Sequence, residues 1–137
     1  MRLAVMFFTI LLMFSGYCCV QAEIVLSGTP QLRISEGGTS RAIDTLSVDD
    51  AAEYKCVVSE VDGKYYWSTR ENVELVRVAG GLYVTYIAVN GGGYVRIIDP
   101  GFKELMAPMM TDEEKRFDYV EHMLTGLSSI SYYGTLE

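Results

Sequence analysis

The sequence predicts a mainly β, β-rich α+β fold: an antiparallel meander or partly closed small barrel with one C-terminal α-helix, preceded by a cleavable signal peptide. Three observations predict this fold. Residues 1–22 form an apolar leader, short β-branched and aromatic runs alternate with glycine-containing turns in the middle, and an amphipathic pattern covers about residues 112–125. The chain has 137 residues, is 50% hydrophobic and carries a formal charge of −7, which excludes collagen-like, coiled-coil and disordered classes.

The leader has the features of a secretory signal. A single positive charge at Arg2 precedes the apolar run, and small residues near its end predict cleavage between Ala22 and Glu23. The mature protein is then one small exported domain, residues 23–137, that is periplasmic or secreted. One alternative is that the leader stays uncleaved, because its apolar stretch is long enough to act as an N-terminal membrane anchor.

Cysteine usage makes the domain depend on its apolar core. Cys18 and Cys19 lie in the leader, where acylation is a further alternative, so Cys56 is the single cysteine of the mature domain. Cys56 lies in an alternating run, which predicts a buried thiol that packs as a small hydrophobic side chain. A reactive or intermolecularly paired thiol is the alternative.

The charge balance points away from nucleic acid. Loss of Arg2 with the leader leaves ten of the 11 basic residues against all 18 acidic residues, a charge of −8. The basic residues are scattered and not clustered, whereas phosphate binding needs clustered Lys and Arg. The expected partner is therefore a protein with a basic surface, with no nucleic acid, and with a membrane only if the leader is uncleaved.

The first third of the domain is weakly patterned, and the middle is clear. Short strands are predicted over 24–26 and 32–34, and a helical turn over 45–53 with Ser47 as its N-cap. Asp62 and Gly63 form the strongest short-range hairpin signal between two β-rich runs. The strands expected in this antiparallel meander are 54–61, 64–69, 73–79, 82–90 and 94–99.

A C-terminal helix is predicted over about residues 112–125. Thr111 and Glu114 form a capping box at its start, and Gly126 stands where a helix would stop. The stripe expected to dock on the sheet consists of Phe117, Val120, Leu124 and Leu127. The tail 128–137 is expected to be a last strand or an ordered strap.

No motif identifies a reaction, so no catalytic residue, metal site or cofactor is assigned. The single histidine, His122, and the absence of a C-x-x-C pair argue against a zinc site. A small carboxylate-dependent hydrolase is the alternative class, and Glu71, Glu74 and Asp99 are the acids that would have to converge in a pocket.

Aromatic residues of the hairpin favour a binding role. Tyr65 and Trp67 precede Arg70, and exposed Tyr, Trp and Arg are typical anchors of protein interfaces. Packing in the core is the other interpretation of these rings. The candidate binding residues are Tyr65, Trp67, Arg70, Glu71 and Glu74.

Three methionines cluster before the predicted helix. Met106, Met109 and Met110 could line an adaptable apolar groove, bind copper(I) or plug the end of the core. Together these patterns predict a non-catalytic binding module, in its sharper form an acidic inhibitor or binder of a basic protein. A structural exported protein without a ligand is a further alternative.

Overall fold

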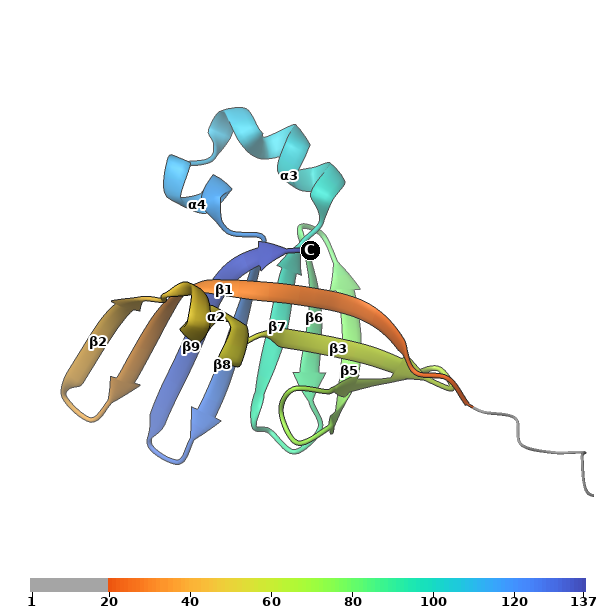
Figure 1. Cartoon of the computed structure of the whole chain (residues 1–137). Helices are drawn as coiled ribbons and strands as arrows, with labels where there is room; N and C mark the ends of the chain where they lie inside the picture. Colours follow the sequence, from red (N-terminus) through yellow and green to blue (C-terminus); the bar gives the residue numbers. More distant parts are fainter. Residues whose placement is uncertain (1–19) are drawn as a thin grey trace, which may run out of the picture.

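Eight antiparallel strands close into a barrel in the computed structural model, which describes residues 20–137 (Figure 1). The strands are β1 (Glu23–Gly37), β2 (Ser40–Thr45), β3 (Cys56–Val61), β4 (Lys64–Trp67), β5 (Val73–Gly80), β6 (Tyr83–Ala88), β7 (Gly93–Ile98), β8 (Tyr119–Thr125) and β9 (Ser128–Leu136). All of them except β2 belong to the closed ring. The sequence predicts a meander or a partly closed barrel, whereas the structure has a fully closed one.

Strand β1 closes the ring because it pairs along both edges. Gly28 is opposite Cys56 of β3 on one edge and opposite Leu136 of β9 on the other. The second half of β1 also pairs with β2, which extends the sheet beyond the barrel (Figure 1). The first and last strands of the described chain are thus neighbours.

The two short strands predicted over 24–26 and 32–34 are one continuous strand. Register shifts lie between Ile24 and Leu26 and between Pro30 and Leu32, so β1 bends around the barrel without ending. Because Pro30 adjoins the second shift, its missing N–H falls where the ladder is already irregular.

The predicted meander is confirmed by strands β3 to β7. Asp62 and Gly63 both have positive φ, 52° and 77°, as a two-residue turn between twisted antiparallel strands requires. The predicted helical turn is α2 (Val48–Glu53), and the Ser47 side chain accepts a hydrogen bond from the Asp50 N–H at its N-cap.

The predicted helix over 112–125 is wrong beyond its first turns. Its capping box is present, but α4 (Asp112–Arg116) has only five residues, and the chain then enters strand β8. Pairing of β8 with both β7 and β9 overrides the helical spacing. The predicted stripe does not form: Val120 lies on the outer face, and Leu127 is fully exposed next to Gly126, whose φ of 64° serves a turn. The tail is a strand, β9, as one of the two expectations states.

Short helical segments lie outside the barrel. Helix α3 (Pro100–Met106), the 3-10 helix η1 (Ala107–Met109) and α4 connect β7 to β8 and form a helical arch, residues 100–116, at the top of Figure 1. Within residues 20–137 no helix combines the length and the apolar character that a bilayer crossing needs. The predicted signal peptide lies almost entirely in residues 1–19, outside the described part, and Glu23 at the predicted cleavage point begins β1.

The close approach of β9 to β1 gives a test of the closure. A Cβ added at Gly134 would collide with the carbonyl oxygen of Thr29 and would lie 2.7 Å from Pro30 Cα. Because both obstacles are backbone atoms, we expect Gly134→Ala to lower the free energy of unfolding by about 3 kcal/mol, measured by urea denaturation. Gly80→Ala is the control, since nothing lies within 4 Å of its added Cβ. Equal effects of the two variants would contradict the closure.

Candidate functional site

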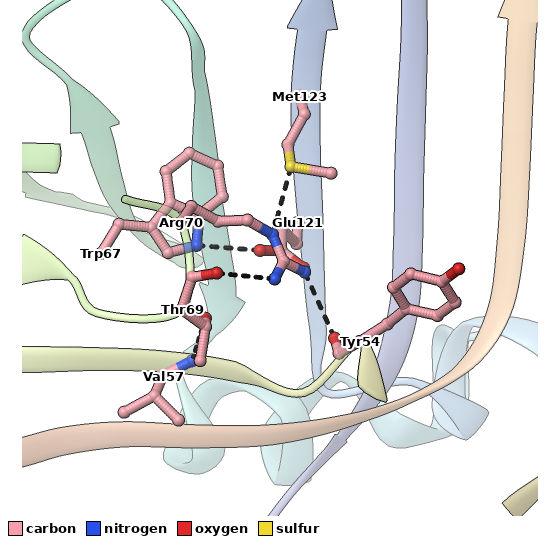
Figure 2. Close-up of polar contacts among 7 residues, drawn as sticks. All are labelled: Tyr54, Val57, Trp67, Thr69, Arg70, Glu121 and Met123. Atoms are coloured by element: carbon pink, nitrogen blue, oxygen red, sulfur yellow. Dashed lines mark hydrogen bonds and ion pairs between the residues drawn. The ribbon is translucent and has the colours of Figure 1, made fainter. Parts of the chain in front are cut away.

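A carboxyl group is buried inside the barrel. Glu121 lies on the inner face of β8, between Tyr119 and Met123, and its side chain is 0% exposed. The indole Nε1 of Trp67 donates a hydrogen bond to one carboxyl oxygen at 2.8 Å, and Nη2 of Arg70 donates to the other at 2.9 Å (Figure 2). These two donors offset part of the free energy that burial of a carboxylate costs.

Arg70 is fixed by contacts on several sides. It follows β4 in a turn shaped by the positive φ values of Glu71 and Asn72, 52° and 55°. Its guanidinium donates to the carbonyl oxygens of Thr69 and Tyr54 at 3.0 and 3.3 Å, and its Nε lies 3.2 Å from the sulfur of Met123 (Figure 2). Its side chain is only 20% exposed, so it serves mainly the interior cluster.

Burial changes the acid–base properties of this cluster. Desolvation raises the pKa of Glu121 to about 7, although Arg70 and Trp67 oppose the shift. Desolvation, with the nearby Glu121, also raises the pKa of Cys56 well above its usual value. The buried Cys56 predicted from the sequence is confirmed, and its thiol is protonated and shielded. The cluster therefore combines protonatable groups with little access for a reactant.

A cavity of about 700 Å³ lies outside the barrel wall, under the helical arch. Its barrel side is formed by outer-face residues, which include Leu32, Ile34, Val120 and Tyr133. Its arch side includes Phe102, Met106, Met109, Met110 and Phe117. The methionines thus line a groove, as one of the interpretations of the sequence states.

The arch is fastened at both ends. Asp99 accepts a hydrogen bond from the Phe102 N–H at the start of α3, and the Thr111–Glu114 capping box begins α4. Lys103 on α3 forms an ion pair with Asp118 at 2.5 Å, which ties the arch to the segment entering β8. The two caps define where the short helices begin, and the Lys103–Asp118 pair holds α3 against the barrel side of the cavity.

The structure separates the site residues predicted from the sequence. Trp67, only 2% exposed, and Arg70 meet at Glu121, so Trp67 is a core side chain and not an exposed anchor. Tyr65 is half-buried and packs edge-to-face against Tyr86, with ring centroids 5.3 Å apart. The rings of Tyr65 and Trp67 both lie on the inner face of the sheet, because alternate residues of β4 point to the same face.

The predicted acids do not converge in the described part of the chain. Glu71 lies exposed in the turn, Glu74 pairs with Lys64 at 3.5 Å, and Asp99 caps α3. Glu121 was missed because the sequence favoured a helix there. Its signal was the inward alternation of Tyr119, Glu121 and Met123, in which one acid stands between two apolar residues.

No protein-family model, curated protein or solved structure matches this chain significantly. Fold and geometry therefore define the class: a small closed antiparallel barrel with a buried polar cluster and an outer apolar cavity. Within residues 20–137 no three His, Cys, Asp or Glu side chains gather closely enough to hold a metal ion.

The raised pKa of Glu121 predicts a pH-dependent stability. The carboxyl of Glu121 has its ordinary pKa of 4.5 in the unfolded chain, so it loses its proton at lower pH there than in the folded protein. The stabilisation that the protonated Glu121 contributes is therefore full below pH 4.5 and is lost as the pH rises through about 7. We expect the free energy of unfolding to fall by about 2 kcal/mol between pH 5 and pH 8, measured by urea denaturation.

Two substitutions isolate this effect. Glu121→Gln cannot titrate and should show a flatter profile, whereas Glu74→Gln should keep the wild-type slope because it leaves the cluster intact. A wild-type slope in Glu121→Gln would assign the effect to other groups.

Burial of Cys56 predicts an inert thiol. In the native protein we expect a disulfide reagent such as DTNB to leave Cys56 unmodified, because the thiol is both protonated and inaccessible. Cys56→Ser should then leave the native reaction unchanged and reduce by one the thiols counted in guanidinium. Loss of a native signal in Cys56→Ser would show that the interior opens.

Proposed function

We propose that this protein is a small exported, non-catalytic binding module whose ligand is a small, mainly apolar molecule held between the helical arch and the barrel wall. The observation that carries the proposal is the cavity of about 700 Å³, which is lined mainly by apolar side chains. Its volume falls in the range of small-molecule sites.

The composition of the lining supports an adaptable site. Met106, Met109 and Met110 contribute unbranched, polarisable side chains that can repack around ligands of different shape. Met109 is 78% exposed and Leu105 on the same arch is 74% exposed, so the arch presents apolar surface that a bound ligand or a neighbouring surface can cover.

Binding of a basic protein stays a prediction with weaker support. Glu71 is exposed in the turn after β4, but Trp67 and Tyr65 face the interior of the barrel and are not available as anchors. A hydrolase has less support still, because the carboxyl with the raised pKa is Glu121, which lies enclosed in the core and outside the cavity lining.

A matched pair of substitutions tests the cavity. Val120 on β8 and Val76 on β5 are both outward-facing valines, but only Val120 lines the cavity. We expect Val120→Trp to fill the space and to weaken binding of the uncharged dye Nile red about tenfold or more, as measured by fluorescence titration, while Val76→Trp binds like wild type.

Thermal unfolding of both variants supplies the control for folding. If the folded wild type binds no dye, or if both variants bind equally well, the cavity is not the ligand site. The structural role without a ligand would then be the better explanation.

A further inference from the structure

One cationic side chain in the cavity wall is not neutralised by the protein. Arg96 lies on the outer face of β7, because its neighbours Val95 and Ile97 point into the barrel, and it stands opposite Thr85 of β6 and Val120 of β8. Arg96 is one of the residues that line the cavity, and its guanidinium lies over the ring of Tyr83, another lining residue.

The contacts of Arg96 orient it without satisfying its charge. Its Nε donates to the Thr85 hydroxyl at 3.2 Å, and its guanidinium carbon lies 5.4 and 5.1 Å from the ring centroids of Tyr83 and Tyr94. Within residues 20–137 no carboxylate pairs with Arg96, and its two terminal nitrogens make no hydrogen bond. The two rings and Thr85 therefore position a fork of unused N–H donors.

The other charged groups of the lining are placed differently. Lys103 is paired with Asp118, and Glu114 is engaged in the capping box with Thr111. Glu113 is exposed on the first turn of α4. Arg96 is thus the half-buried cation of the lining whose terminal N–H donors stay unused.

An entirely apolar ligand would leave this cation in an unfavourable state. Filling the cavity removes water from the guanidinium, and desolvation of an unpaired charge is costly unless the ligand supplies acceptors. A carboxylate matches the planar guanidinium with two parallel hydrogen bonds. We infer that the ligand of this cavity is a long-chain carboxylate, whose head is bound by Arg96 and whose chain lies against the methionines of the arch.

The charge of the lining favours a carboxylate over a phosphate. Glu113, Glu114 and Asp118 lie in the same lining, so a head with one negative charge meets less repulsion than a head with two. The inference rests on the proposed function, because it names the ligand class of the same cavity.

Four ligands that share the same 14-carbon chain and differ in the head group test which head group the cavity prefers. Myristate, tetradecanol, tetradecylamine and tetradecyl phosphate are each used to displace Nile red, below their aggregation concentrations. We expect myristate to compete about tenfold better than tetradecanol or more, and better than the amine and the phosphate.

Arg96→Gln separates recognition of the head from support of the wall. This variant should lose the preference for myristate and keep the affinity for tetradecanol within about a factor of two. Arg77→Gln, an exposed arginine of β5 outside the lining, is the control and should behave like wild type.

Each failure has its own meaning. If tetradecanol, the amine or the phosphate competes as well as myristate, or if Arg96→Gln weakens all four ligands equally, the inference is overturned while the cavity proposal stands. If Nile red binds but no alkyl ligand displaces it, the long-chain carboxylate is also overturned. If Nile red itself does not bind the folded protein, the proposed function fails with it.

Discussion

Pairing of β1 along both edges is the constraint on which the rest of the structure depends. Strand β1 joins β3 on one side and β9 on the other. Without β1 the sheet would stay open and would enclose no interior. The junction is reinforced at the end of β9, because Glu137 accepts hydrogen bonds from Ser27 and Thr29 of β1 and pairs with Lys55. These contacts lower the pKa of Glu137 to about 2. One continuous strand therefore converts a meander into a ring.

The closed ring separates a polar interior cluster from an apolar space outside the wall. A small eight-stranded barrel has an interior just wide enough for side chains to fill it. Here the filling includes the polar cluster of Trp67, Arg70 and Glu121. The apolar space lies instead outside the wall, where the helical arch spans β7 to β8. The strands supply the rigid wall of the cavity, and the arch supplies its adaptable side.

How far the sequence could predict this structure follows from the range of each interaction. The Asp62–Gly63 turn and the Ser47 cap are local, so their residues alone specify them. The capping box at the start of α4 is local in the same way, and its prediction is confirmed. Val120 and Leu124, however, fit both a helical stripe and one face of a strand, and only the pairing with β9 decides between helix and strand. The ion pair of Arg70 with Glu121 joins residues 51 positions apart, and no local pattern indicates it.

The same closure determines when the protein can become complete. Thr29 and Glu137, which meet at the junction, are 108 positions apart in the chain. Contacts of such long separation form slowly, because the entropy of the intervening loop is lost before the pairing compensates for it. Until β9 has been synthesised, β1 keeps an unpaired edge of backbone donors and acceptors, which is a template for association with other chains. The barrel can therefore close only when β9, the last strand in chain order, is available to pair with β1.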